Sequence, residues 1–406
     1  MIDILDIPGL SPISSIVNEP DKTLIIEAKI SKELVHSGEC PHCGASGRIR
    51  LWGKRHRRYR DIPSRGYRVL IKLESQRYSC NSCKKSFCQI AVGMDPKRSM
   101  TLRCSEWIAQ QSLVTTSSHV AEQVGCSQKT VMEIAFEYIR KQERKSRRPL
   151  PSWLGITEVH FGRKMKGRWC VLIDLEDGQI VEMLPNCSQS SIRAWLLSFK
   201  GSLQFRGACI GMCAQYRTAL KGAFPGAEIV VDKAQMFRAA NDAVNRAYMR
   251  SKVAAGEKRF SVEWKQVRSL LPSRRSDLLD HERRLLDSWI RGHKDISEAY
   301  RLKEEFLEIY ECKQRRDAEL ALDRWEHNVP ANLRSQFKEL LFALKSWRKE
   351  ILAYFGNEKS LELPEVVDFN IKQLCRAKGE NSFEMVRGKV LFGRIALRSS
   401  RRRLVA

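Results

Sequence analysis

The spacing of hydrophobic and polar positions changes along the chain, and in the middle of the chain it predicts strands mixed with helices. Short apolar runs there are typical of strands, and Asp177-Gly178, between the second and third runs, is typical of a tight hairpin. Longer stretches with helical periodicity follow. The pattern predicts the order βββαβαβα, with strands at 154–161, 169–175, 179–184, 208–212 and 228–232, helices at 191–199 and 215–224, and a long helix to about 250.

A helix-turn-helix is predicted before this region. Residues 106–113, 118–124 and 127–136 have helical periodicity, Gly125 supplies a tight turn and Ser127 can cap the helix after it. The apolar seam would consist of Ala121, Val124, Val131 and Ile134. Helix pairs with a glycine turn also occur in cores that touch no DNA. If the unit reads DNA, the residues presented to the major groove are Ser127, Gln128, Lys129, Thr130 and Glu133.

The segment 251–360 has Leu, Trp and Tyr at helical spacing among dense charges, which predicts an all-helical insertion. Pro364 opens a further helical stretch through Leu374, and the chain ends in a cationic tail. Two prolines at 149 and 151, within a cationic stretch, indicate a linker before the mixed region.

The charge of the chain favours a polyanionic partner. Its 406 residues include 72 Lys and Arg against 47 Asp and Glu, a formal net charge of +25, and residues 40–150 alone hold 23 basic and 8 acidic residues. Nucleic acid is the first candidate partner. With 43% hydrophobic and 29% charged residues, and no apolar run of about 18 residues, the composition excludes a disordered tail and a membrane-spanning protein.

The N-terminal residues and the cysteines indicate the compartment. Asp3 and Asp6 stand where a signal peptide would carry Lys or Arg, so we expect no export. The 13 cysteines are an odd number, and several, such as Cys170 and Cys209, lie singly in apolar runs. This usage suits reduced thiols in a cytoplasmic protein.

Two cysteine pairs predict a structural zinc site. Cys40-Pro-His-Cys43 and Cys80-Asn-Ser-Cys83 can each present two thiolates on a tight turn, and together they supply the four ligands of tetrahedral zinc. The 36 residues between them include a strand-like run at 67–74 and could form a ribbon with a long hairpin. The alternatives are four unrelated cysteines, or substitution of one ligand by Cys88 or His42.

A cationic stretch lies between the two cysteine pairs. Trp52 and Tyr59 lie beside it and could stack on bases. Held by a zinc-fixed hairpin, such cations could contact a phosphate backbone, whereas the simpler alternative is a solvated charged face. The candidate DNA-contacting residues are Lys54, Arg55, Arg57, Arg58 and Arg60.

The order of these features resembles the bacterial insertion-sequence transposases of the ISL-three (ISL3) family over nearly the whole chain. Each motif is weak alone, but their order is specific. The motifs are Cys40-Pro-His-Cys-Gly44, Arg58-Tyr-Arg-Asp-Ile-Pro63, Arg77-Tyr-Ser-Cys-Asn-Ser-Cys83 with Phe87, Val171-Leu-Ile-Asp-Leu175 before Gly178, Tyr300-Arg-Leu-Lys-Glu-Glu305 and Trp347-Arg-Lys-Glu-Ile-Leu-Ala-Tyr-Phe355.

The resemblance implies an α+β multidomain protein with a ribonuclease-H-like catalytic domain, whose DDE triad binds divalent metal for DNA cleavage and strand transfer. It also implies double-stranded DNA and a second copy of the chain as partners, in a bacterial, nucleoid-associated setting. We expect an N-terminal segment with the zinc ribbon at 1–100, the helix-turn-helix at 101–150, the ribonuclease-H-like core at 151–250, the helical insertion at 251–360, and at 361–406 a C-terminal helix completing the core with a basic tail.

The sequence departs from the family at the triad. Two metal ions need carboxylate ligands to stabilise the attacking and leaving oxygens, but the first acidic position falls on Thr157, with Glu158 on the opposite face of the strand, and the second falls on Gly211. Asp232 keeps the acid of a further family segment whose histidine becomes Gln235. The third acid falls on Glu365, and Asp174 is the best substitute if the alignment has slipped.

The sequence therefore predicts a transposase-family protein that binds transposon-end-like DNA and is catalytically impaired. It would contain structural zinc, with Mg²⁺ or Mn²⁺ only if it is active. The alternative is an active DDE transposase with a displaced carboxylate. A third hypothesis is a protein-interaction platform that binds other proteins through its helical insertion.

Overall fold

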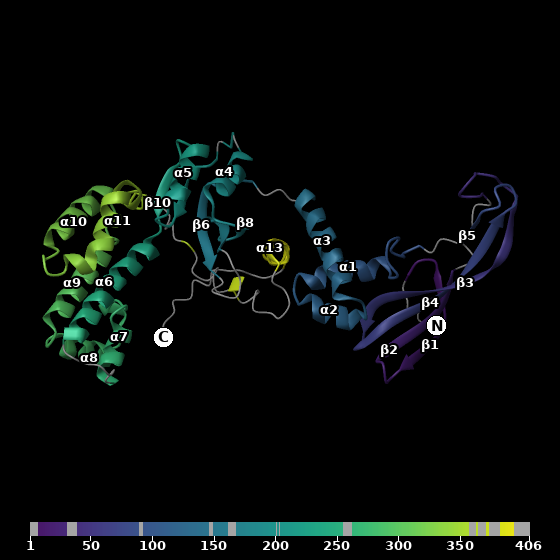
Figure 1. Cartoon of the computed structure of the whole chain (residues 1–406), viewed down its shortest axis with the longest axis horizontal. Coiled ribbons are helices and arrows are strands. Elements are labelled where there is room, and N and C mark those ends of the chain that lie inside the picture. The colour runs from purple at the N-terminus through teal and green to yellow at the C-terminus, as the bar shows by residue number, and fades with distance from the viewer. Residues whose placement is uncertain are drawn as a thin grey trace. The chain divides into compact units, whose positions relative to one another are not determined.

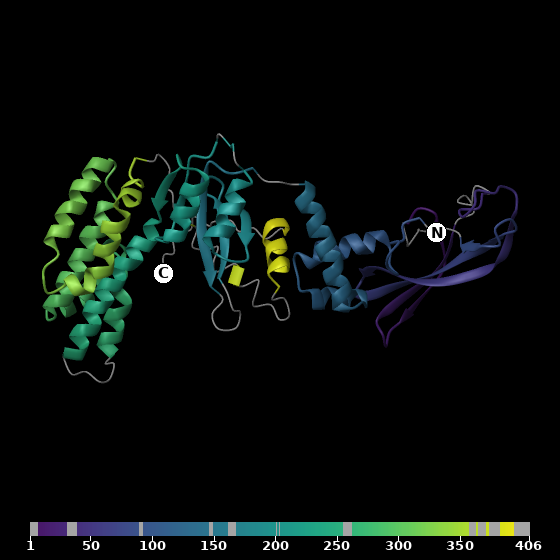
Figure 2. The ribbon, with the colours of Figure 1, turned by 45° about the horizontal axis from the view of Figure 1, so that its top comes forward.

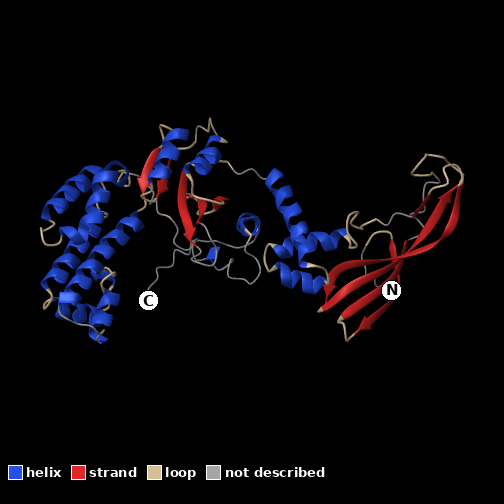
Figure 3. Cartoon of the chain, in the orientation of Figure 1, coloured by secondary structure: helices blue, strands red, loops and turns tan. Residues whose placement is uncertain are grey.

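The computed structural model divides the chain into two units, residues 1–147 with 373–396 and residues 148–372 with 397–406. Each unit has its own sheet and its own helices (Figures 1 and 3). The residues that the structure describes are 7–30, 39–88, 92–145, 149–160, 168–199, 201–202, 204–254, 262–356, 363, 371–372 and 382–393.

The first unit contains a sheet whose longest strands form one hairpin. Its strands are β1 (Leu10–Asn18), β2 (Thr23–Ile30), β3 (Ile49–Ser64), β4 (Tyr67–Cys80) and β5 (Ser86–Cys88). The order is β1-β2-β4-β3, with β5 beside the end of β4, and all neighbours are antiparallel except β2 and β4. Apolar side chains gather on one face, where Tyr59, Ile71 and Leu73 pack with Ile26. The other face of the hairpin carries mostly polar residues, with apolar exceptions such as Leu70.

Three helices follow the sheet in the first unit: α1 (Leu102–Ser112), α2 (Ser117–Val124) and α3 (Gln128–Lys145). Thr101 caps α1 and Thr116 caps α2, each accepting a backbone N–H with its side chain. The C-terminal helix α13 (Phe383–Phe392) packs against α3, where an added Cβ on Gly388 would lie 2.2 Å from Ile139. Glycine therefore permits this close approach.

The second unit contains a five-stranded mixed sheet. Its strands are β6 (Trp153–His160), β7 (Arg168–Asp174), β8 (Ile180–Leu184), β9 (Gly207–Ile210) and β10 (Glu228–Val231). The order is β10-β9-β6-β7-β8; β6, β9 and β10 run parallel and β7 is antiparallel to both of its neighbours. The predicted strand order along the chain and the Asp-Gly hairpin are confirmed. This is the mixed sheet of the expected ribonuclease-H-like core.

The helices of the second unit complete the mixed core and form the insertion (Figure 2). Buried residues of α4 and α5, such as Ile192 and Leu220, pack in one cluster with Ile156 and Ile210 of the sheet. The long α6 contacts both α9 and α11, which extends this core into the helical insertion. The bounds are α4 (Gln189–Leu197), α5 (Ala214–Ala223), α6 (Lys233–Ala254), α7 (Val262–Leu270), α8 (Asp280–Ile290), α9 (Lys294–Ile309), α10 (Arg315–Asn328) and α11 (Arg334–Leu352).

The C-terminal region contributes a helix to the first unit, where α13 packs on α3. The helix expected to complete the ribonuclease-H-like core lies almost entirely outside the described residues. Lys389 donates to the carbonyl of Thr115 at 2.8 Å, and Arg387 pairs with Glu143 of α3. These contacts hold α13 on the helix-turn-helix. Of the predicted helix at 364–374, the structure describes only residues 371–372, which are helical.

Candidate functional site

The four predicted zinc ligands meet at one point. Cys40 and Cys43 precede β3, and Cys80 and Cys83 end the returning β4 and the turn after it. The Sγ atoms of Cys40 and Cys83 lie 3.7 Å apart, those of Cys43 and Cys80 3.8 Å apart, and all four lie within 4.8 Å of one another. Zinc–sulfur bonds of about 2.3 Å in a tetrahedron place sulfurs about 3.8 Å apart. The cluster therefore fits a tetrahedral zinc ion.

The turn after β4 also favours a thiolate. Backbone N–H groups of Cys83 and Ser82 donate to the sulfur of Cys80, and they lower the pKa of this thiol to about 6. Zinc binds the thiolate rather than the thiol. Among the described residues, this is the only group of three or more His, Cys, Asp or Glu side chains close enough to share a metal ion.

The predicted helix-turn-helix is present. Gly125 ends α2 in the left-handed conformation, with φ of 75°, and its N–H donates to the carbonyl of Ala121. Ser127 accepts the N–H of Thr130 at 3.1 Å, so the predicted cap of the second helix is confirmed. Lys129 is exposed, whereas Gln128 is partly buried. The four seam residues Ala121, Val124, Val131 and Ile134 are buried in one cluster.

The five predicted phosphate-contacting cations lie along β3, but they do not share one face. Lys54, Arg55, Arg57 and Arg58 are exposed, and Arg60 is partly buried. Lys54 pairs with Glu74 at 2.8 Å, and Arg57 donates to the hydroxyl of Tyr59 at 3.5 Å. Arg60 donates from Nε to the carbonyl of Gly125 at 2.7 Å.

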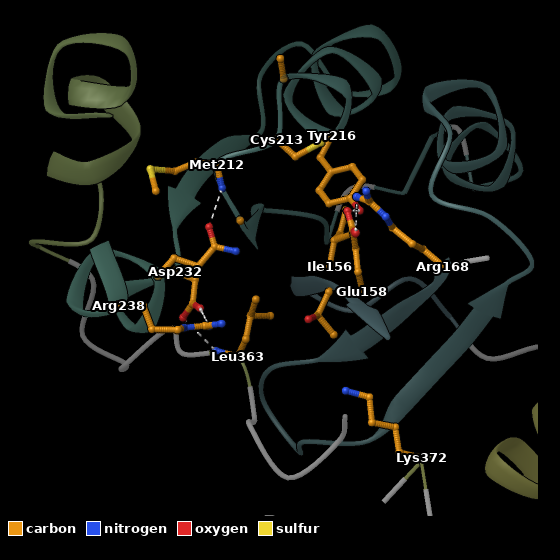
Figure 4. A pocket seen from close by; sticks show the side chains of 14 residues that line it. Ile156, Glu158, Arg168, Met212, Cys213, Tyr216, Asp232, Arg238, Leu363 and Lys372 are labelled. Atoms are coloured by element: carbon orange, nitrogen blue, oxygen red, sulfur yellow. Dashed lines mark hydrogen bonds and ion pairs between the residues drawn. The ribbon is translucent and has the colours of Figure 1, made fainter. Parts of the chain in front are cut away.

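A pocket of about 760 Å³ lies at the C-terminal ends of the parallel strands of the second sheet (Figure 4). In open mixed sheets this edge is where ligands usually bind. The pocket is lined by both Thr157 and Glu158, although strand alternation places their side chains on opposite faces of β6. Gly211 and Asp232, which follow β9 and β10, line it as well.

Glu158 is the pocket carboxylate that the sequence prediction passed over. It accepts a hydrogen bond from the hydroxyl of Tyr216 and one from Arg168 at 3.3 Å (Figure 4). Burial and the bond to Glu158 raise the pKa of Tyr216 well above its usual value, so the phenol stays protonated and donates. The sequence could have indicated this residue, because Glu158 directly follows Thr157 and therefore lies at the same end of β6.

Asp232 is the second carboxylate of the pocket and is buried, with 1% of its surface exposed. Its Oδ2 lies 3.8 Å from Arg238, and its Oδ1 accepts the N–H of Leu363 at 3.5 Å. A guanidinium beside the carboxylate balances its charge within the protein.

The space beside Gly211, the position predicted for the second acid, is filled. A Cβ added to Gly211 would lie 2.3 Å from Nε2 of Gln235, and Oε1 of Gln235 accepts the N–H of Met212 at 2.9 Å. The amide of Gln235 therefore occupies the space next to Gly211. Thr157 and Gly211, the positions predicted for the first two acids, offer no carboxylate, and the described pocket brings together the two carboxylates of Glu158 and Asp232.

Asp174, the expected substitute acid, lies away from the pocket. It pairs with Leu154 near the start of β6, three positions from Val171, the partner of Thr157. Three strand residues span about 10 Å, and Asp174 does not line the pocket. Its carboxylate instead accepts the N–H of Glu176 in the hairpin turn. Glu365 lies outside the described residues.

Comparison with known families decides the identity of the chain. The family model of ISL3 transposases, described as transposase and carrying a DDE domain, matches residues 154–389, more than half of the chain. The chain belongs to the ISL3 family of transposases. A second family model, described as the zinc-finger of transposases IS204, IS1001, IS1096 and IS1165, matches residues 36–83 of this transposase. The search of curated proteins finds no match.

Family membership confirms the main predictions from the sequence. The α+β fold with a zinc ribbon followed by a transposase domain is as expected, and the ribbon carries structural zinc on four cysteines. Membership also supports a role in DNA binding and transposition. None of the described helices combines the length and apolarity needed to span a membrane.

Proposed function

We propose that this ISL3 transposase binds transposon-end-like DNA through its zinc ribbon and helix-turn-helix, and that its DNA-cleaving centre is impaired. The observation that carries the second part is the occupied space beside Gly211, where Gln235 takes the room that an acidic side chain would need. A protein that binds transposon ends without cutting them would compete for these ends or regulate transposition.

The electrostatics of the pocket support the same proposal. Each carboxylate of the described pocket has a guanidinium partner, Arg168 for Glu158 and Arg238 for Asp232. A divalent cation would have to compete with these internal cations. The positive charge needed beside the acids is thus supplied by the chain itself.

The first experiment measures cleavage and binding on the same DNA. The full chain is incubated with a labelled duplex containing an inverted-repeat end, in Mg²⁺ and in Mn²⁺, while gel shifts follow binding. We expect salt-dependent binding without cleavage or strand transfer. Binding no tighter than to random duplex at moderate salt would refute the DNA-recognition part, and metal-dependent cleavage would refute the impairment.

An active enzyme with displaced acids is the second candidate, because Glu158 and Asp232 line one pocket. In that case Asp232→Asn should abolish metal-dependent cleavage while gel shifts remain unchanged. The matched control is Asp174→Asn, which changes an acid of the same sheet that does not line the pocket. Cleavage that survives Asp232→Asn excludes this assignment.

The proposal also covers the assembly of the protein. By family resemblance we expect a homodimer that holds two DNA ends in the bacterial nucleoid, with the helical insertion available to other proteins. Light scattering with and without end DNA measures the stoichiometry, and a monomer on one duplex would contradict the dimer.

A further inference from the structure

We propose that the β3–β4 hairpin and the helix-turn-helix form one continuous surface for duplex DNA, in which Arg60 and Arg68 position the helices and do not contact the DNA. The inference rests on the proposed DNA binding and assigns the surface that performs it. It divides the cations of the hairpin between two faces and gives each face a different role.

The register of the hairpin defines the two faces. Tyr59 pairs with Ile71 and Arg57 with Leu73, and Tyr59, Ile71 and Leu73 belong to the apolar cluster of the sheet. Because side chains alternate along a strand, Arg55 also lies on this apolar side. The opposite side, here called the basic face, carries Lys54, His56, Arg58 and Arg60 of β3 and Arg68, Lys72 and Glu74 of β4.

Two cations of the basic face, Arg60 and Arg68, are bound to the helix-turn-helix. Arg60 donates to the carbonyl of Gly125 at 2.7 Å, and Arg68 donates to the carbonyl of Glu122 at 2.9 Å. These carbonyls lie at the C-terminal end of α2, where cations are favoured by the helix dipole. Both guanidinium groups therefore fix the turn that leads into α3, beside the basic face.

Gly125 fits this contact closely. A Cβ added at this position would lie 3.1 Å from Cδ of Arg68, and the φ of 75° already disfavours any other residue. The guanidinium chain of Arg68 thus packs directly on the turn of the helix-turn-helix.

A buried clamp on the other side of β3 makes the arrangement rigid. Asp61 is 2% exposed; it accepts the hydroxyl of Thr101 at 2.6 Å and Nε of Arg103 at 2.9 Å. The backbone of Arg60 adds two hydrogen bonds. Its N–H donates to the carbonyl of Ser99, and its carbonyl accepts the N–H of Thr101. Strand and helices are therefore held from both faces, and they cannot shift independently without breaking these bonds.

The geometry fits a duplex better than a small anion. The zinc cluster lies at one end of the hairpin and α1 and α2 lie at the other (Figure 1). Lys54 to Arg58 spans about 13 Å of strand, which equals the rise of about four base pairs along the DNA axis. Arg58 and Lys72 stand directly opposite each other at one end of this span. With α3 in a major groove, the basic face would follow the adjoining phosphate backbone.

The experiment uses the full chain and a duplex of about four helical turns, selected by the chain from a random-sequence library. Hydroxyl-radical footprinting maps the protected backbone, and titration over salt gives the slope of log K against log salt. Arg58→Gln and Lys72→Gln should each reduce this slope by about 0.9 and weaken binding roughly five-fold at about 0.15 M salt. They should also remove the protection that flanks the site of α3.

The matched control is Arg57→Gln, which removes the same charge from the neighbouring position on the opposite face. It should leave slope and footprint unchanged. Equal effects of Arg57→Gln and Arg58→Gln would overturn the division into two faces. If the wild-type chain selects no duplex, the proposed DNA binding itself has failed; if it binds but only the α3 site is protected, this inference alone has failed.

The role of Arg60 and Arg68 is tested by the double variant Arg60→Gln/Arg68→Gln. If Arg60 and Arg68 position the helices, the double variant should still protect both regions of the DNA, but the distance between the two regions should become variable. The zinc content should be unchanged. A sharp wild-type footprint combined with a slope reduced by about two would show direct phosphate contacts and overturn the positioning role.

Discussion

Adding one methyl group at Gly211 tests whether the second acidic position of the family is physically closed. The new Cβ of Gly211→Ala would lie 2.3 Å from Nε2 and 3.0 Å from Cδ and Oε1 of Gln235. Gln235 must therefore move, and in moving it gives up its bond to the N–H of Met212. Overpacking costs about 1–3 kcal/mol, and the lost hydrogen bond about 0.5–1.5 kcal/mol.

Chemical denaturation should therefore show Gly211→Ala to be less stable by about 1.5–4.5 kcal/mol, the sum of these ranges. The matched control is Gly226→Ala, because no atom lies within 4 Å of its added Cβ. That variant should be neutral or slightly more stable, since alanine restricts the unfolded chain.

A double-mutant cycle isolates the clash. Gln235→Ala alone loses the bond to Met212, and in its background Gly211→Ala should cost almost nothing. We therefore expect a coupling free energy about equal to the cost of Gly211→Ala in the wild-type chain, about 1.5–4.5 kcal/mol. A Gly211→Ala variant as stable as Gly226→Ala, or a loss that Gln235→Ala does not relieve, would refute the argument that Gln235 fills the place of the acid.

Two further predictions concern the cysteines. Cys80→Ser should reduce zinc, measured by atomic absorption, from one ion per chain to almost none, whereas Cys88→Ser should retain it because Cys88 is not in the cluster; equal zinc loss from both would contradict the ligand set. Burial raises the pKa of Cys104 to about 12, so iodoacetamide near pH 8, close to the pKa of about 8.5 of a free thiol, should modify Cys104 only after unfolding. Peptide mass spectrometry checks this, and rapid labelling of the folded protein would be inconsistent with it.

Local patterns in the sequence were sufficient where neighbouring residues determine the structure. Asp177-Gly178 specifies a hairpin whatever surrounds it, and Gly125 and Ser127 end one helix and cap the next through bonds to nearby backbone groups. The two cysteine pairs likewise predicted the cluster, because the chemistry of zinc requires four such ligands.

Contacts between distant segments were not predictable from these patterns. The strands β1 and β2 were missed because Ile13 and Ile16 of β1 stay exposed, which obscures the alternation. The placement of Asp174 depended on the pairing register of β6 and β7, which sets Asp174 opposite Leu154 and not opposite Thr157.

Charge alone also did not reveal what each cation contacts. The sequence does not distinguish the three arginines at 57, 58 and 60. In the structure, Arg57 bonds to the hydroxyl of Tyr59, Arg58 lies on the basic face, and Arg60 bonds to the carbonyl of Gly125. The difference arises from strand alternation combined with a helix end contributed by a segment about 65 residues away.

The cysteine cluster has a consequence for the whole hairpin. Its ligands come from the chain just before β3 and just after β4, so the metal ties together the open ends of the two strands, where Ile49 pairs with Cys80. A slip of one residue would turn every side chain of a strand to the other face, exchanging Arg58 for Arg57 on the basic face. Zinc bound to the four cysteines would therefore fix the pairing register of the two strands along the whole hairpin, including the part far from the ion.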